Sequence, residues 1–171
     1  MGYQYIFGPV PSRRLGVSLG IDLVPLKTCS YNCVYCECGK TTCLTTERKE
    51  YFPTAAIIRE LDEYLKTRPN LDFITFAGSG EPTLHTGLGA IARHIRKTYP
   101  EYRMALLTNG SLFTDPELRR EVADIHVVIP SLDAASERVF KKIDRPCAPL
   151  TAAGIIDGLV ALKQEHPGEV W

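Results

Sequence analysis

The sequence predicts an α/β fold in which parallel strands alternate with helices around one sheet. Short apolar segments with β-branched residues alternate with segments whose apolar residues recur at helical spacing. A cysteine-containing or polar motif directly follows each of the first four strand segments. Such alternation forms right-handed βαβ units, and their functional groups gather at the carboxyl ends of the strands. We therefore expect one domain over residues 1–171 with a single site at that edge.

The expected strands lie at residues 17–24, 71–77, 103–107, 125–129 and from 169 onward. The expected helices lie at residues 53–65, 87–98, a short segment from 115, 136–142 and 151–164. Asp115 is a natural N-cap, and Pro116 suits the first turn that follows it. A complete (β/α)8 barrel takes roughly 250 residues. The chain has room for four units and a fraction, so we expect a partial barrel that is truncated in the fifth strand, as a shortened chain or as a natural fragment that a partner completes.

Residues 1–16 are expected to form a loop or lid, because residues 3–16 are rich in glycine, proline and arginine. Within this segment Arg13 and Arg14 would suit an anion such as a carboxylate or a phosphate. The alternative is a solvated surface pair.

Charge and cysteine content narrow the function classes. Lys+Arg and Asp+Glu number 20 each, so the total charge does not support binding to nucleic acid or to an anionic membrane, although a local basic patch would still allow nucleic acid. No apolar run is long enough to cross a bilayer, and no secretory signal is visible. Six cysteines without an export signal indicate the reducing cytoplasm and metal binding.

Cys29, Cys33 and Cys36 stand in a C-x3-C-x2-C pattern just after the first expected strand. A short loop can direct three thiolates at one centre, which suits a soft metal or an iron–sulfur cluster. Zinc would need a fourth ligand, which Cys38 or Cys43 could supply, so a zinc or redox module stays open. Three sulfurs cannot all pair in disulfides.

With Tyr35 directly before the last cysteine, this pattern resembles the signature of the radical S-adenosylmethionine (SAM) superfamily. The resemblance implies a partial TIM-like barrel and a [4Fe–4S] cluster held by the three cysteines. It also implies that the fourth iron is left open for the amino and carboxylate groups of SAM. Reductive cleavage would then give a 5′-deoxyadenosyl radical that abstracts hydrogen from a substrate. A one-electron donor such as flavodoxin or ferredoxin would be the partner, and Tyr35 would lie near the adenine.

Three further motifs follow strands and match the same family. Gly78-Ser79-Gly80-Glu81 resembles its Gly-Gly-Glu element, which binds the SAM amino group, with Ser79 in place of the first glycine; a strand-to-helix turn is the alternative. Ser131 and Asp133 resemble positions that contact the SAM ribose or carboxylate, and Asn109 holds a position that often lines the SAM pocket. Helix capping by Ser131 or Asp133 and a turn at Asn109-Gly110 are the alternatives.

Other residues receive weaker interpretations. His85 could act on substrate, but a lone histidine is more often structural, so it is left out of the catalytic set. Arg145 is a candidate for substrate or for the SAM carboxylate. Among the additional cysteines, Cys38 is the serious rival ligand, and if it bound the cluster it would close the open iron.

Residues Phe7–Gly16, followed by Pro25–Cys29, resemble a subgroup of radical SAM iron–sulfur oxidoreductases related to the enzymes that build wyosine bases in tRNA. This implies an enzyme with an unknown substrate. A tRNA-modifying role and a non-catalytic iron–sulfur or zinc module remain as alternatives.

Overall fold

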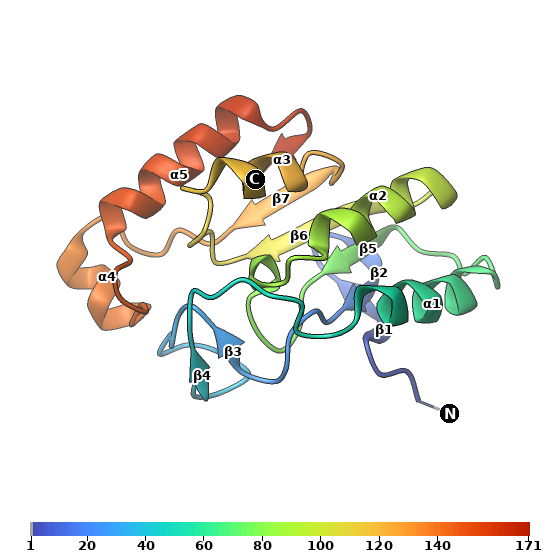
Figure 1. Ribbon diagram of the computed structural model, residues 1–171, viewed down its shortest axis with the longest axis horizontal. Coiled ribbons are helices and arrows are strands. Elements are labelled where there is room, and N and C mark those ends of the chain that lie inside the picture. The colour runs from blue at the N-terminus through green and yellow to red at the C-terminus, as the bar shows by residue number, and fades with distance from the viewer. Residues whose placement is uncertain (1) are drawn as a thin grey trace.

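The computed structural model describes residues 2–171 and contains one main sheet of six strands in the order β1-β2-β5-β6-β7-β8 (Figure 1). The strands are β1 (Ile6–Ser12), β2 (Gly16–Ile21), β5 (Phe73–Phe76), β6 (Arg103–Thr108), β7 (Val127–Pro130) and β8 (Glu169–Val170). From β2 to β8 all neighbours are parallel, and only β1 is antiparallel to its neighbour. The predicted α/β architecture with its partial barrel is therefore confirmed, including the fifth strand of the parallel series.

Helices connect the parallel strands and cover one face of the sheet (Figure 1). They are α1 (Thr54–Leu65), the 3-10 helix η1 (Pro82–Leu84), α2 (Leu88–Thr98), α3 (Pro116–Glu121), α4 (Glu137–Ile143) and α5 (Ala152–Glu165). The helical spacing of Ile57, Leu61 and Leu65 places all three in the main core. Asp115 caps α3 through the Glu117 amide at 2.8 Å, as predicted.

The opposite face of the sheet carries a smaller apolar cluster of Leu15, Phe73, Ala105 and Val127, which includes no helix residue. Side chains along a strand alternate between the two faces. Leu107, two residues after Ala105, and Ile129, two residues after Val127, therefore lie on this open face as well. No helix within residues 2–171 is long and apolar enough to cross a membrane.

The loop or lid predicted for residues 1–16 is wrong for residues 6–12, which form strand β1. Pro9 and Pro11 argued against a strand. However, β1 is an edge strand with a neighbour on one side only, so a proline that lacks an N–H on the other side loses no hydrogen bond to another strand. The pairing with β2 also shifts register between Phe7 and Val10, next to the first proline.

The first parallel strand ends at Ile21, three residues before the predicted end at Val24. After it the chain forms an unpredicted two-stranded ladder of β3 (Thr28–Cys29) and β4 (Cys43–Leu44), which brackets the cysteine loop. Two-residue strands carry no periodicity that a sequence could reveal.

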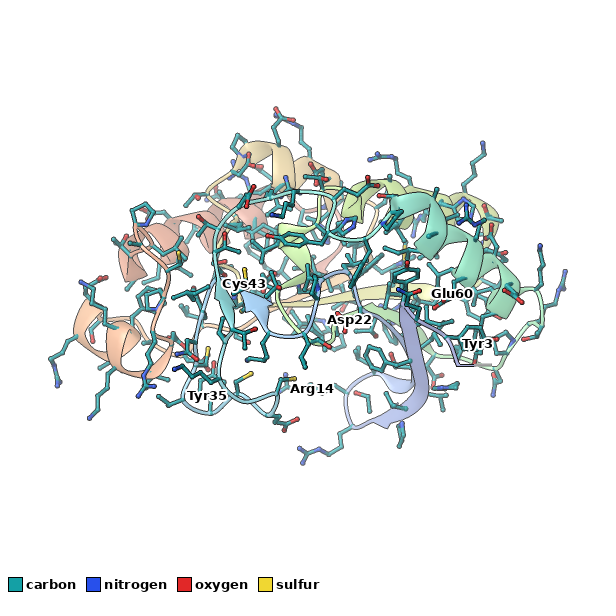
Figure 2. The ribbon with its side chains drawn as sticks, turned by 60° about the horizontal axis from the view of Figure 1, so that its bottom comes forward. Tyr3, Arg14, Asp22, Tyr35, Cys43 and Glu60 are labelled. Carbon is teal, nitrogen blue, oxygen red and sulfur yellow. The ribbon has the colours of Figure 1, made fainter. Side chains whose placement is uncertain are left out.

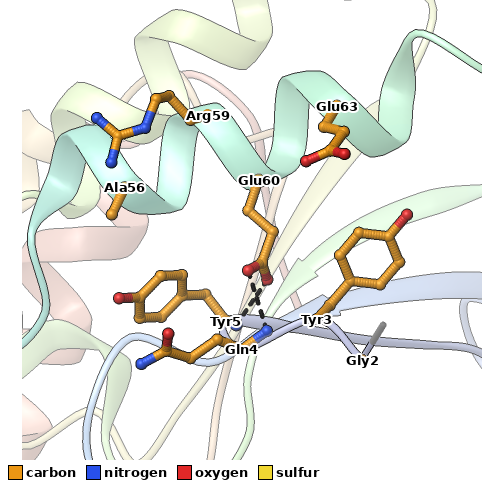
Figure 3. A pocket seen from close by; sticks show the side chains of 8 residues that line it. All are labelled: Gly2, Tyr3, Gln4, Tyr5, Ala56, Arg59, Glu60 and Glu63. Atoms are coloured by element: carbon orange, nitrogen blue, oxygen red, sulfur yellow. Dashed lines mark hydrogen bonds between the residues drawn. The ribbon is translucent and has the colours of Figure 1, made fainter.

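Glu60 on α1 ties the N-terminal segment to the helix layer (Figure 3). Its carboxylate accepts from the backbone amides of Gln4, Tyr5 and Ile6 at 3.0, 2.6 and 2.9 Å. The hollow of about 570 Å³ beside these contacts is lined by the N-terminal segment and α1. None of the predicted site residues lines it.

Candidate functional site

The four motifs predicted from the sequence follow the four parallel strands β2, β5, β6 and β7 in order. Because these strands are parallel and adjacent, their carboxyl ends meet at one edge of the sheet. Hydrogen bonds then connect the motifs to one another, so the structure brings the predicted residues to one place.

The cysteine loop, residues 28–44, is docked on α4 and on the residue that follows it. The Asn32 amide donates to the Asp144 carbonyl at 2.9 Å, and the Val34 amide donates to the Ile143 carbonyl at 2.9 Å. The Tyr31 ring packs edge-on against Phe140 with centroids 5.4 Å apart. The loop conformation therefore depends on residues more than 100 positions away in the sequence.

Cys29 lies deepest of the predicted ligands, beside the ends of β3 and β6. Its sulfur accepts from the Tyr31 amide at 3.4 Å and from the Asn109 side-chain amide at 3.5 Å. Burial, reinforced by the charge of Glu81, raises the pKa of the Cys29 thiol to about 11. Binding a metal would therefore release a proton here, so occupancy should increase with pH.

Cys33 and Tyr35 face acidic residues from two other segments. The Cys33 thiol lies 3.7 Å from the Asp144 carboxylate, and burial raises the pKa of this thiol to about 12. The Tyr35 hydroxyl donates to Asp133 and lies 3.4 Å from Asp144. Tyr35 and Asp133, predicted from separate motifs, are thus brought together.

Cys36 has a different electrostatic environment, because the Lys27 ammonium donates to its sulfur at 3.0 Å. Burial acts to raise the pKa of Cys36, but the Lys27 hydrogen bond and contacts with Cys38 outweigh it, so that this pKa is lowered. Lys27 is only 5% exposed, and its backbone has a φ of 60°. Cys36 is consequently the ligand most readily available as a thiolate.

Glu81 is 2% exposed, and its carboxylate is fully engaged. One oxygen accepts from the Thr83 amide and hydroxyl and from the Thr108 hydroxyl, at 2.6–3.0 Å, and the other accepts from the Asn109 amide at 2.7 Å. Burial nevertheless raises the pKa of Glu81. This carboxylate caps η1, as in the alternative interpretation, and it also joins the ends of β5 and β6.

The two glycines of this motif, Gly78 and Gly80, allow other parts of the chain to pack closely against their backbone. Gly78 has a φ of +139°, and a Cβ there would lie 2.7 Å from the Asp22 carboxyl carbon. At Gly80 a Cβ would lie 2.0 Å from the Thr28 carbonyl oxygen. The Ser79 amide donates to Asp22 at 3.1 Å, and its hydroxyl also bonds that carboxylate. The close approach of the cysteine loop to β5 therefore requires glycine, and contact of these residues with SAM stays a prediction.

Asn109 forms the turn that was the alternative to SAM binding, and it also reaches the cysteine loop. Its side-chain oxygen accepts from the Ser111 amide at 3.0 Å, while its nitrogen donates to the Ser30 hydroxyl at 2.9 Å. The alternative of helix capping by Ser131 or Asp133 is wrong, since Ser136 precedes α4. Both residues are exposed just after β7.

His85 is fully buried, with its ring nitrogens near the Gly87 amide and the Phe52 carbonyl, each at 2.8 Å. Burial lowers the pKa of His85. These contacts support leaving it out of the catalytic set. Arg145, in contrast, lines a hollow of about 370 Å³ together with Cys33 and Cys36.

Sequence reasoning missed three side chains at this edge, namely Asp22, Lys27 and Asp144. Asp22 was hidden inside an expected apolar strand, although a charged residue there was a signal of the strand end. Lys27 stands two residues before Cys29, and only the folded loop reveals its contact with Cys36. Asp144 lies 111 positions from Cys33, so no local pattern could pair them.

The site offers the donor set of an iron–sulfur cluster. All six cysteines are free thiols, and soft thiolates are the ligands of such clusters. The Tyr31 hydroxyl, between Cys29 and Cys33 in sequence, is buried and has no hydrogen-bond partner within residues 2–171. A group bound beside these cysteines would supply one. No three His, Cys, Asp or Glu side chains in that range lie close enough together for one metal ion. This finding covers Cys29, Cys33 and Cys36 as well, so ligation of a cluster or of zinc by these residues stays a prediction.

The family model described as "Radical SAM superfamily" matches residues 23–167. This stretch runs from just after β2 to the turn before β8 and includes every predicted ligand. The chain belongs to the radical SAM superfamily.

Curated relatives match almost the whole chain. A protein named "GTPase Obg" from Brachyspira hyodysenteriae is 43% identical over 166 residues, which are 97% of this chain and 24% of that protein. UPF0026 proteins from Methanocaldococcus jannaschii and Synechocystis are 36% and 38% identical over 96% and 98% of this chain, and the chain covers 51% and 63% of them. The chain thus spans less than two thirds of each of these relatives.

Solved structures with the same fold include anSMEcpe with bound AdoMet (TM-score 0.62, 19% identity). The matched region is 90% of this chain and 42% of the anSMEcpe chain. For a radical SAM methyltransferase from Sphaerobacter thermophilus the TM-score is 0.60 and the identity 15%, and the match covers 90% of this chain and 45% of the methyltransferase. For BtrN in complex with AdoMet and 2-DOIA the TM-score is 0.53 and the identity 20%, and the match covers 88% of this chain and 56% of BtrN. At these identities the likeness establishes the fold.

Proposed function

We propose that this protein is a radical SAM enzyme in which Cys29, Cys33 and Cys36 hold a [4Fe–4S] cluster and SAM is cleaved reductively. The observation that carries the proposal is the position of these cysteines. Their loop is docked at the carboxyl edge of the parallel sheet, beside the ends of β5, β6 and β7. A cluster held by these cysteines would supply one electron to SAM, whose cleavage to methionine and a 5′-deoxyadenosyl radical would allow hydrogen abstraction from a substrate.

The protein's own residues position these groups. The Asn109 amide faces the Cys29 sulfur and Lys27 faces the Cys36 sulfur, so hydrogen-bond donors address two of the three ligands. Tyr35 and Asp133 connect the loop to the end of β7, where the family resemblance places SAM. Six free cysteines fit the cytoplasm, where a flavodoxin or ferredoxin would donate the electron.

The rival interpretation is a non-catalytic four-thiolate module with Cys38 as the fourth ligand. Contacts from Cys38 help to lower the pKa of Cys36, so the two residues are close. The two interpretations differ in whether an iron stays open for SAM.

Single alanine variants at Cys29, Cys33, Cys36, Cys38 and Cys43 separate the two interpretations. The full-length protein is reconstituted anaerobically with iron and sulfide, and bound iron and 5′-deoxyadenosine are measured. We expect Cys29→Ala, Cys33→Ala and Cys36→Ala to lose both signals, and Cys38→Ala and Cys43→Ala to keep both. SAM should also change the EPR spectrum of the reduced cluster. Intact SAM cleavage in Cys29→Ala, or loss of the cluster in Cys38→Ala, would refute the assignment.

A further inference from the structure

The largest cavity described lies on the open face of the sheet and encloses about 820 Å³. It is lined by Ser12, Arg13, Arg14, Leu15, Glu37, Leu107 and Ile129. Its volume is in the range of small-molecule sites, which extends from about 300 to 1,000 Å³. Glu37 directly follows Cys36, so the cavity extends from the β1–β2 turn to the cysteine loop. Figure 2 shows Arg14 and Tyr35 on the same side of the molecule.

The turn that carries Arg13 and Arg14 is anchored on both sides. Leu15 is 3% exposed and packs in the apolar cluster of the open face, and its amide lies 3.2 Å from the Ser12 hydroxyl oxygen. Asp72 accepts from the Val17 amide at 2.7 Å. The two guanidinium groups therefore extend from a fixed backbone, which reduces the entropy lost when they bind a ligand.

The charge at this cavity is unbalanced. Neither Arg13 nor Arg14 forms an ion pair within residues 2–171, a property that they share with six other arginines, while Arg48, Arg103, Arg119 and Arg120 each contact a carboxylate. Glu37 is the one acidic residue in the lining, which leaves an excess of one positive charge. Leu107, 38% exposed, and Ile129 add an apolar wall beside these donors. Two guanidinium groups that line one cavity favour bidentate contact with carboxylate or phosphate oxygens.

We infer that Arg13 and Arg14 bind the phosphate or carboxylate group of a small substrate, whose apolar part lies against Leu107 and Ile129. The inference rests on the proposed function, because it places the rest of the substrate between this turn and the cysteine loop. It replaces the solvated surface pair with a defined role.

The test uses two probes, pyrophosphate and glutarate, which distinguish phosphate from carboxylate recognition. Binding to the full-length protein is followed by calorimetry and by the Nε–H NMR signals of arginine. The double variant Arg13→Gln/Arg14→Gln should bind the preferred probe about a hundredfold more weakly or worse, since it loses the charge-assisted hydrogen bonds of both guanidinium groups. Arg138→Gln, the same substitution at one exposed position of α4, should bind like wild type.

The double variant Arg13→Lys/Arg14→Lys keeps the charge but loses the planar forks, so its affinity should fall between the other two. The inference is overturned if wild type binds neither probe, or if Arg138→Gln weakens binding as much as the double glutamine variant. If Arg13→Gln/Arg14→Gln does not fold, the NMR spectra of wild type decide: the probe should shift the Nε–H signals of two arginines, and no shift overturns the inference. The binding measurement contains no iron, SAM or reductant, so its failure leaves the proposed function standing, and failed SAM cleavage leaves a measured anion affinity standing.

Discussion

At the scale of single residues, Glu81 shows how one carboxylate can organise a site without contacting solvent. Its oxygens accept bonds from residues after β5 and at the end of β6, and all of these donors are buried or partly buried. Desolvation of a carboxylate is costly unless such donors compensate it. The carboxylate thereby fixes Asn109, whose side chain reaches Cys29.

Glu81→Gln should lower the free energy of unfolding by about 1–3 kcal/mol, because the amide group would face donors instead of accepting from them. The loss should depend on pH. Burial raises the pKa of Glu81 above its usual value of 4.5, so the folded chain holds this proton more tightly than the unfolded chain. The stabilisation from Glu81 is therefore complete below pH 4.5 and declines as pH rises through the folded-state pKa.

Urea denaturation of wild type and Glu81→Gln between pH 4.5 and pH 7 measures this effect. The difference between the two proteins should shrink as pH rises. Glu63→Gln, at an exposed position on α1, is the matched control and should show no such trend. A difference that stays constant or grows with pH would contradict the assignment of the raised pKa.

Lys27 supports a prediction about the redox potential of the proposed cluster. A buried ammonium that donates to a ligand sulfur stabilises the reduced, more negative cluster. Lys27→Met should therefore lower the midpoint potential by about 50 mV, which is close to a tenfold change in the equilibrium constant of a one-electron reduction. EPR-monitored redox titration gives this value independently of turnover. Lys66→Met, at an exposed position after α1, should leave the potential unchanged, and an unchanged potential in Lys27→Met would rule out the role.

At the scale of elements, periodicity predicted the structure well where an element has a buried stripe or face. Helix α1 was predicted from the helical spacing of Ile57, Ile58, Leu61 and Leu65, and the strand ends were located well enough to group the polar motifs. Strand β1 was missed because its prolines are tolerated only at an edge, and edge position is a property of the sheet. The contacts of Lys27 and Asp144 with the cysteines were missed because tertiary packing alone creates them.

The dependence of the cysteine loop on α4 can be tested at Phe140, which is buried against Tyr31. Phe140→Ala should cost about 3–5 kcal/mol and release the loop. Amide hydrogen exchange across residues 31–36 should accelerate more than exchange in β5 and β6. Val160→Ala, at an exposed position on α5, is the control. Equal acceleration in all these segments would indicate global destabilisation and contradict local support of the loop by α4.

At the scale of the whole molecule, the arrangement of the sheet explains why the site is concentrated at one edge. One face is filled by helices, and the other is open and carries the cavity near Arg13 and Arg14. The parallel strands direct their carboxyl ends to the cysteine loop. The cavity at Arg13 and Arg14 is also lined by Glu37, which directly follows Cys36, so the proposed anion site borders the cysteine loop.

The charge distribution of the whole chain also bears on the tRNA alternative. The 20 basic residues are balanced by 20 acidic ones, and several are paired on the surface, including Arg103 with Glu169, Arg119 with Glu165 and Lys141 with Glu137. Binding to tRNA depends on releasing counterions from many phosphates, which requires an extended basic surface. Arg13 and Arg14 supply two cationic groups at one cavity, which suits a small anion better than a polyanion.

We therefore expect the 171-residue chain to give no tRNA gel shift below about 10 µM protein at about 150 mM salt, because its charge supports only non-specific contact. A titration from low to high salt measures the number of phosphate contacts through its slope. A shift at submicromolar protein with a steep salt dependence would contradict this expectation. If Arg13→Gln/Arg14→Gln then abolished that shift while Arg138→Gln did not, the two arginines would belong to an RNA site, and the small-substrate assignment of the cavity would fail with it.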